Sequence, residues 1–151
     1  MQIGALSIAF AALSVAIGLT ACGNPLEVGL LPMVVEGDRT VSPNNPGEFE
    51  VAIQNNGNER IIWGMGSSSC QLSLFVIADD IRHLVDDRAC TEDLVEQGLD
   101  PGDRRTETFQ WDGHIPDIEG QPFLLPDGEY ELVGTAGTEA ESEPFSVRVE
   151  R

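Results

Sequence analysis

Short runs in which apolar and polar residues alternate, each followed by turn residues, constrain the fold of this chain most. Phe49, Val51 and Ile53 alternate with polar or small residues, and the turn signal Asn-Asn-Gly-Asn follows at 55–58. A period of two indicates a half-buried β-strand, because successive side chains of a strand point to opposite faces. Similar short strand-like segments lie at 28–35, 61–63, 72–77, 106–111, 130–133 and 145–149. The sequence therefore predicts an all-β fold.

Turn-forming residues separate these segments, at 43–47, 64–69, 100–103, 126–128 and 134–137. The best helical pattern lies at 90–97, and it extends over no more than a turn or two. A series of about seven to eight short strands with turns between them predicts an antiparallel β-sandwich of the immunoglobulin-like type. A small barrel is the alternative architecture.

Three aromatic residues refine this prediction. Tyr130 follows an Asp-Gly turn at the start of a late strand, which resembles a tyrosine corner, where the hydroxyl group bonds to the preceding loop. Trp63, on an early strand, suits the core tryptophan of such folds. Trp111 falls on the apolar phase of its strand and is expected in the core, with partial exposure at the strand end as the alternative.

The N-terminal segment has the pattern of an export signal. No charged residue occurs before position 22, and 3–19 is almost entirely apolar, as in the core of a signal peptide. The apolar run stops at Cys22 and lacks the charged or aromatic anchors of a transmembrane helix. Leu-Thr-Ala-Cys at 19–22 resembles the bacterial lipobox, in which the cysteine receives a diacylglycerol before cleavage.

These features predict the division of the chain. We expect residues 1–21 to be a lipoprotein-type signal peptide, 22–26 a tether and 27–151 one β-sandwich domain, with Cys22 as the lipid-attachment residue. The alternative is an ordinary secretory signal. The predicted location is the cell envelope, on the extracytoplasmic side of a membrane, and the outer membrane where the cell has one, because Gly23 rather than Asp follows the cysteine.

The cysteines support an extracytoplasmic location. The chain has 3 of them, Cys22, Cys70 and Cys90, and lipid on Cys22 leaves the other two as a pair in an oxidising compartment. A disulfide closing a loop of this size stabilises a domain by about 3 kcal/mol in the chain-entropy model. We expect a Cys70–Cys90 disulfide that holds a loop or an edge, because the positions differ from those of the antibody inter-sheet bridge. Two buried free thiols are the alternative.

The charge of the chain narrows its range of partners. It has 26 acidic residues and 8 basic ones, all arginine, which gives a formal net charge of -18 at pH 7. Such a field repels nucleic acid and anionic lipid head groups at long range. We therefore expect no nucleic-acid partner.

Several motifs follow one another between Asn55 and Val149, a stretch of about 95 residues. They are Asn-Asn-Gly-Asn at 55–58, Leu-Phe-Val-Ile at 74–77 followed by Asp-Asp at 79–80, Leu-Asp-Pro-Gly-Asp at 99–103, Phe-Gln-Trp-Asp-Gly at 109–113, and Leu-Pro-Asp-Gly-Glu-Tyr at 125–130. In this order they resemble the BsuPI-type intracellular proteinase inhibitor family. The more specific part is the spacing of Pro-Gly, Trp-Asp-Gly and Asp-Gly-x-Tyr.

The resemblance implies an immunoglobulin-like β-sandwich and, through the family's name, inhibition of proteinases. The chain departs from the family's namesake, which is intracellular, in its export signal and its cysteine pair. No inhibitory loop motif carries over residue by residue. The fold therefore transfers better than the function.

Residues that could carry catalysis are few. The 2 histidines are His83 and His114, and the serines at 67–69 lie in a glycine-flanked loop without a nucleophile-elbow pattern. A serine-histidine-carboxylate triad needs all three groups in contact, and no spacing here predicts that. We expect no catalytic residue, no enzymatic activity, and both histidines at the surface.

Two groups of carboxylates could supply oxygen ligands to calcium. They are Asp79, Asp80, Asp86 and Asp87, and Asp112, Asp117 and Glu119. Neither group has EF-hand spacing, and Cys70 and Cys90 are better placed to pair with each other than to bind zinc. We expect solvated carboxylates, no metal site and no cofactor.

These observations together predict a membrane-anchored extracytoplasmic module that acts by binding. Its partner is expected to be a protein of unknown identity, a proteinase among the candidates, while the lipid provides the contact with the membrane. The alternatives are a proteinase inhibitor of the BsuPI type and, third, a hydrolase.

Overall fold

The structure is a computed structural model that describes residues 32–85, 88–117, 119–138 and 140–151. These residues form 13 strands and no helix, in the order β1 (Met33–Gly37), β2 (Thr40–Val41), β3 (Gly47–Gln54), β4 (Ile61–Gly66), β5 (Ser73–Ala78), β6 (Ile81–Leu84), β7 (Val95–Leu99), β8 (Arg104–Trp111), β9 (His114–Pro116), β10 (Pro122–Leu124), β11 (Gly128–Ala136), β12 (Ala140–Glu141) and β13 (Phe145–Val149). None of the described segments is a helix long and apolar enough to cross a membrane.

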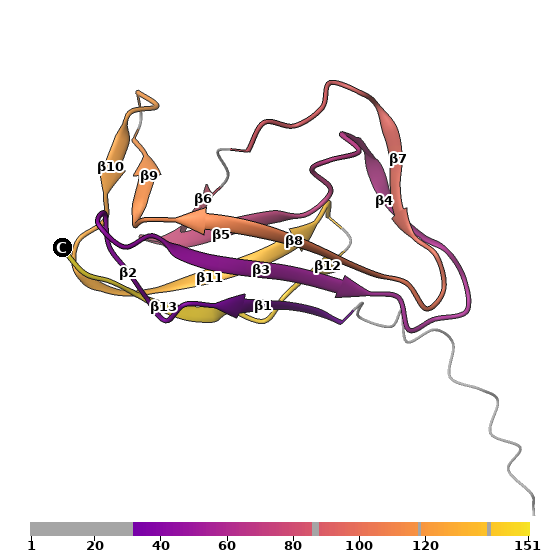
Figure 1. The fold of residues 1–151 in the computed structure, drawn as a ribbon, viewed down its shortest axis with the longest axis horizontal. Helices are drawn as coiled ribbons and strands as arrows, with labels where there is room; N and C mark the ends of the chain where they lie inside the picture. The colour runs from indigo at the N-terminus through magenta and orange to yellow at the C-terminus, as the bar shows by residue number, and fades with distance from the viewer. Residues whose placement is uncertain (1–31, 86–87, 118, 139) are drawn as a thin grey trace, which may run out of the picture.

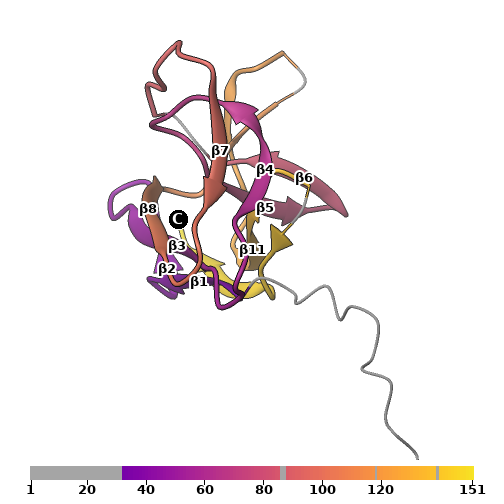
Figure 2. The ribbon, with the colours of Figure 1, turned by 90° about the vertical axis from the view of Figure 1, so that its right-hand side faces the viewer.

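Two sheets pack face to face (Figure 1). One contains three strands in the order β1-β3-β8, and the other contains six, in the order β2-β13-β11-β5-β6 with β12 paired to β11. All pairs are antiparallel except β2 with β13. Two further two-stranded ribbons, β4-β7 and β9-β10, stand outside these sheets. Both ribbons project to the same side of the sandwich (Figures 1 and 2).

The core lies between the two sheets and is built from the alternating residues of the sequence. Phe49, Val51 and Ile53 of β3 are buried, and the Phe49 ring packs against Trp111 and Phe145 at centroid distances of 6.5 and 6.2 Å. Burying one such side chain stabilises the fold by about 1.5–3 kcal/mol. The other sheet contributes the buried residues Leu74, Val76, Leu132, Val147 and Val149.

The strand order confirms the immunoglobulin-like prediction and not the barrel. The strands β1, β3 and β8 correspond to A, B and E of that fold, and β5, β11 and β13 correspond to C, F and G. The predicted tyrosine corner is also present, since the Tyr130 hydroxyl donates a hydrogen bond to the Pro126 carbonyl at 2.9 Å. Burial raises the pKa of Tyr130, with the nearby Asp79 charge acting in the same direction.

The two tryptophans are both buried, at 6% exposure for Trp63 and 4% for Trp111. The alternative of a partly exposed Trp111 is therefore wrong, because the β9-β10 ribbon covers that strand end and the indole Nε1 donates to the His114 carbonyl at 2.7 Å. Trp63 lies in the core as expected. Its strand, β4, however, pairs with β7 in a ribbon rather than within either main sheet.

The structure corrects two details of the sequence-based prediction. Residues 90–97 form no helix, because 90–94 are irregular and Val95 begins β7. Of the predicted first strand at 28–35, residues 28–31 lie outside the described part of the chain, and β1 begins at Met33.

Candidate functional site

A hollow lies beneath the β9-β10 ribbon, between the base of that ribbon and the ends of β6 and β8. It has a volume of about 430 Å³ and is lined by Pro46, Leu84, Val85, Gln110, Trp111, Asp112, His114, Ile115, Pro116, Gly120 and Pro122. Most of these side chains are apolar, and Asp112, His114 and Gln110 supply the polar groups. We call this hollow the hairpin groove.

The Trp-Asp-Gly sequence builds the base of the hairpin groove. Asp112 Oδ1 accepts a hydrogen bond from the His114 backbone N–H at 3.1 Å and lies 3.0 Å from His114 Nδ1. Gly113 adopts a positive φ of 92°, and a Cβ there would lie 3.0 Å from Val149 Cγ1. A glycine is thus favoured for both conformational and steric reasons. The turn at Gly113 directs β9 away from the sandwich (Figure 1).

The tip of the β9-β10 ribbon is closed by Asp117. Its Oδ1 accepts hydrogen bonds from the backbone N–H groups of Glu119 and Gln121, both at 2.8 Å. An aspartate that bonds its own following backbone in this way fixes a tight turn. The carboxylate of Asp117 therefore has a structural role in this tip.

Strand β6 forms one edge of the six-stranded sheet, beside the hairpin groove. Asp79 and Asp80 join it to β5 in a two-residue turn with φ values of 52° and 62°, which is the φ pattern of a type I′ hairpin. Val85 N donates to Leu74 O at 2.8 Å. Hydrogen-bonded pairs alternate along an antiparallel ladder, so the backbone groups of Arg82 and Leu84 point away from β5.

The β6 edge pairs with no other strand in the described part of the chain. Apolar side chains nevertheless remain exposed here, at 58% for Ile81 and 48% for Leu84. On β10, Phe123 is 49% exposed. An open edge with apolar side chains is a template for pairing with an extended segment of another chain.

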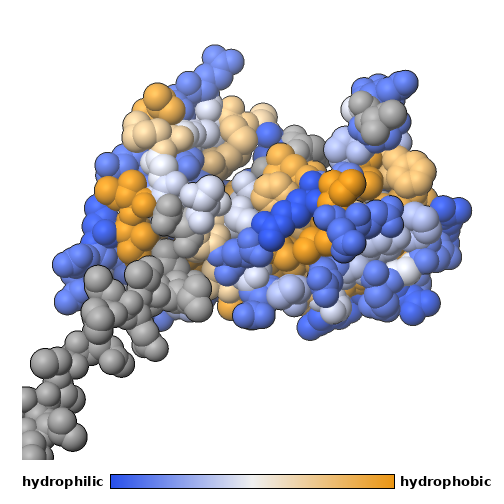
Figure 3. All heavy atoms as spheres, turned by 180° about the vertical axis from the view of Figure 1, so that it is seen from behind, coloured by the Kyte–Doolittle hydropathy of each residue, from blue (hydrophilic) through white to orange (hydrophobic). Residues whose placement is uncertain are grey.

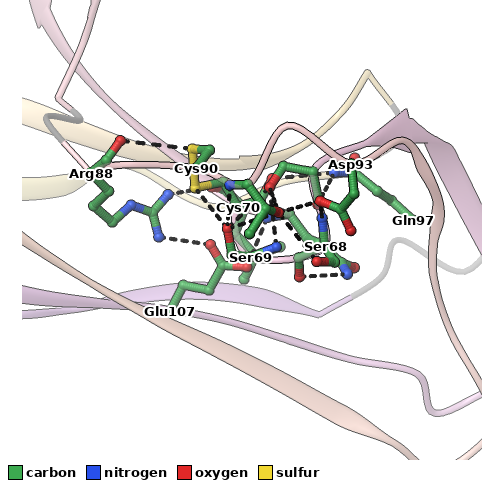
Figure 4. Close-up of a disulfide and its surroundings, with 12 residues drawn as sticks. Ser68, Ser69, Cys70, Arg88, Cys90, Asp93, Gln97 and Glu107 are labelled. Carbon is green, nitrogen blue, oxygen red and sulfur yellow. Dashed lines mark hydrogen bonds and ion pairs between the residues drawn. A yellow bond between two sulfur atoms is a disulfide. The ribbon is translucent and has the colours of Figure 1, made fainter.

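The Cys70–Cys90 disulfide is formed, as predicted, with the two Cα atoms 5.6 Å apart (Figure 4). It joins the segment before β5 to the segment between β6 and β7, so it holds a loop and does not bridge the two sheets. This pairing confirms the expectation for Cys70 and Cys90. The lipid-attachment residue, Cys22, lies outside the described residues.

Hydroxyl groups and Asp93 surround the disulfide. Thr91 bonds to Ser67 at 2.8 Å and also donates to the Asp93 carboxylate, while the Ser68 backbone N–H donates to Asp93 at 3.1 Å. Hydrogen bonds from Thr91 and then from Ser68 lower the pKa of Asp93 to about 2. The serines at 67–69 therefore serve to hold the two loop segments together.

An ion pair fixes the same loop to β8. Arg88 Nη1 donates to Glu107 Oε2 at 2.8 Å, and its guanidinium lies 4.0 Å above the Phe109 ring. Glu107 Oε1 accepts the Gln71 N–H at 2.9 Å. The carboxylate is 10% exposed, so each of its contacts acts in a partly desolvated environment.

Among the described residues, the histidines and serines considered from the sequence do not come together. His114 bonds to Asp112 in the hairpin groove and His83 lies on β6, while the serines at 67–69 bond to Thr91 and Asp93. Within the described residues, no group of three or more potential metal ligands comes together. Asp86 and Asp87 lie outside those residues.

Sequence reasoning missed β6 and the hairpin groove. Two signals were present in the sequence. Asp79-Asp80 stands between two apolar segments, the arrangement of a two-residue hairpin, and Pro116 and Pro122 flank an Asp/Gly-containing tip.

Comparison with known proteins finds no matching family model and no matching curated protein. The solved structures that are similar to this chain include a β-glucosidase from Listeria innocua in complex with isofagomine. The sequence identity is 11% and the TM-score is 0.49, and the match covers 79% of this chain and 16% of the glucosidase. The CARDB domain of a Pyrococcus furiosus protein is similar at 16% identity and a TM-score of 0.45, covering 80% of this chain and 94% of that one.

A second β-glucosidase, from Erythrobacter marinus, is similar at 14% identity and a TM-score of 0.46, covering 79% of this chain and 15% of that one. The chain thus spans about a sixth of the length of the glucosidases it matches. None of these likenesses bears on activity. The class of this molecule is that of an immunoglobulin-like β-sandwich module.

Proposed function

We propose that this chain is an exported, lipid-anchored binding module that captures an extended segment of another protein along β6. The observation that carries the proposal is the open β6 edge, which lies directly beside the 430 Å³ hairpin groove. Such a surface offers backbone hydrogen bonds for affinity and a pocket for selecting one side chain. The module has no enzymatic activity in this proposal.

The outward backbone groups of Arg82 and Leu84 are the ones that a captured strand would pair with. A side chain of that strand would enter the hairpin groove against Trp111, Ile115 and Leu84. Most of the lining is apolar, so an aliphatic or aromatic side chain fits it best.

Export and anchoring are parts of the same proposal. Residues 1–21 are the signal peptide, 22–26 the tether and 27–151 the domain, with lipid on Cys22. The Cys70–Cys90 disulfide supports an extracytoplasmic location, because such bonds persist in oxidising compartments.

The test compares two substitutions of one residue. Leu84→Pro removes an outward N–H and restricts the edge, whereas Leu84→Ala shortens the same side chain and keeps the N–H. We expect an envelope protein captured by the full chain to be lost with Leu84→Pro and retained, at reduced affinity, with Leu84→Ala. A partner that binds Leu84→Pro as tightly as the wild-type chain would contradict strand addition.

Inhibition of a proteinase, as the BsuPI resemblance implies, is the second candidate. The observation that favours it is the projection of the β4-β7 and β9-β10 ribbons from one side of the sandwich (Figure 1). Assays of the full chain against serine and metalloproteinases test this function. Stoichiometric inhibition of one proteinase at nanomolar concentration would favour proteinase inhibition over strand capture. Substrate turnover that is abolished by replacing His83 or His114 would overturn the non-enzymatic proposal.

A further inference from the structure

The outer face of the six-stranded sheet, turned away from the core, carries apolar side chains. Residues directly opposite in a ladder share a face, and Phe75 stands opposite both Leu84 of β6 and Val133 of β11, with Ile77 next along β5. The residues that alternate with them along β5 and β11, such as Leu74, Val76 and Leu132, are buried in the core. Phe75 and Ile77 are half-buried and Leu84 is 48% exposed.

An ion pair crosses this outer face. Arg82 donates two hydrogen bonds to Glu141, each of 2.8 Å. Arg82 lies opposite Ile77, which in turn pairs with Glu131 of β11. Glu141 lies opposite Thr135, four residues further along β11. The bridge therefore spans Val133, which is 1% exposed although it belongs to the outer face. Figure 3 shows a hydrophilic strip between hydrophobic areas on this side.

One end of the outer face is a hollow with four carboxylates. Its volume is about 380 Å³, and it is lined by Ile77, Asp79, Asp80, Glu129, Tyr130, Glu131 and Ser146. Arg148 lies 3.5 Å from Glu129. Among the described residues, no arginine forms an ion pair with Asp79, Asp80 or Glu131. The hollow therefore concentrates negative charge beside the apolar area.

We propose that this outer face is a second docking surface, which binds a protein segment carrying an apolar side chain between lysines or arginines. Charge complementarity selects this occupant, since cationic groups would meet the four carboxylates while the apolar side chain covers Phe75 and Ile77. A second copy of this chain is disfavoured because it would bring like carboxylates together on a molecule of net charge -18. This surface adjoins the β6 edge of the proposed function at Arg82 and Leu84, but its carboxylate hollow and its apolar residues Phe75 and Ile77 belong to β5, β11 and the turn after β5.

The test uses the full chain and a synthetic peptide in which lysine and valine alternate. We expect this peptide to bind more tightly than peptides alternating lysine with serine or glutamate with valine, and to bind less tightly as salt rises. Hydrogen exchange should slow in β5 and β11. The double substitution Glu129→Gln/Glu131→Gln should weaken binding about fivefold, because it removes two exposed charge contacts, and Ile77→Thr should weaken it as well.

The matched control is Glu36→Gln/Glu48→Gln, which removes the same charge from β1 and β3 of the opposite sheet. We expect it to leave peptide affinity within a factor of about two, as only the long-range field changes. Equal weakening by both double variants would show that net charge alone attracts the peptide and would overturn the proposal. Protection confined to β6, β9 and β10, or no binding at millimolar peptide, would overturn it too.

Discussion

Asn55 is a polar residue on which one end of the sandwich depends. It is fully buried, and its side-chain N–H groups donate to the carbonyls of Glu59 at 2.8 Å and Leu99 at 3.0 Å. Its Oδ1 accepts the Gly57 N–H at 2.9 Å. These bonds satisfy the amide group and connect the end of β3 to the end of β7. The Asn-Asn-Gly-Asn motif at 55–58 therefore forms a turn and also anchors it in the core through Asn55.

Replacing Asn55 with alanine should destabilise the domain by about 2–4 kcal/mol, because buried carbonyl and N–H groups lose their partners. The measurement is equilibrium unfolding in urea. Asn56→Ala provides the control, since Asn56 is exposed and its replacement should change the free energy of unfolding by less than about 0.5 kcal/mol. Equal stability of the two variants would contradict the role assigned to Asn55.

Asp93 should titrate at an unusually low pH. Its pKa is lowered from 3.8 to about 2 in the folded state, first by the Thr91 hydroxyl and then by Ser68. A depressed folded-state pKa means that the ionised group stabilises the fold above the unfolded value of 3.8, and that this contribution is lost as the pH falls toward about 2.

NMR titration of the carboxyl carbon measures this pKa directly. Thr91→Val should move the Asp93 pKa upward toward 3.8, since it removes the largest cause of the shift. Thr108→Val, at an exposed position of β8, should not move it. A midpoint near 3.8 in the wild-type chain would contradict the hydrogen-bond network around the disulfide.

At the scale of elements, strands with a clear period of two were predictable and short exposed ones were not. The segments around Phe49 and Phe145 alternate because one face packs into the core. Strands β6, β9 and β10 are three or four residues long and only partly buried, so their sequences lack that alternation. Their positions depend on turns, such as Asp79-Asp80, whose conformation the residue types only weakly specify.

The helix suggested by the pattern at 90–97 does not form, because tertiary contacts hold these residues in another conformation. Cys90 is tied to Cys70, and Thr91 and Asp93 bond to the serine loop. Side chains of this type compete with the backbone bonds of a helix. Local propensity could not anticipate contacts with residues 20 or more positions away.

The disulfide should stabilise the loop that connects β6 to β7 more than the sandwich itself. Reducing the Cys70–Cys90 bond should lower the melting temperature by several degrees, as a loss of a few kcal/mol does in a domain of this size. Hydrogen exchange should accelerate throughout the domain and most in the loop, because the loop can also open locally once the bond is broken. Recovery of both cysteines as free thiols from envelope material, by non-reducing peptide mapping, would contradict the disulfide in the cell.

For the whole molecule, the sequence predicted the sandwich but not the two surfaces that we propose for binding. The hairpin groove combines Pro46 with Leu84 and His114, which lie far apart in the sequence. The outer face has a similar origin, since Glu129 and Asp79 meet there through the pairing of β5 with β11. Strand order and register bring such residues together, and both depend on pairings between strands that are distant in the sequence, which the pattern within one strand does not identify.

Lipid on Cys22 should decide where the whole molecule resides. The Leu-Thr-Ala-Cys sequence ends the apolar N-terminal run. A single acyl chain gives marginal, reversible membrane binding, whereas two or three give a firm anchor.

We therefore expect the wild-type chain in the membrane fraction and its N-terminus at a modified Cys22. Cys22→Ser should leave the protein unlipidated and its N-terminal segment uncleaved, because the lipid is added before cleavage, while Cys70→Ser/Cys90→Ser should leave both steps unchanged. Cell fractionation checks the location and intact mass spectrometry checks the N-terminus, and an unmodified N-terminus or cleavage at another residue would contradict the anchor.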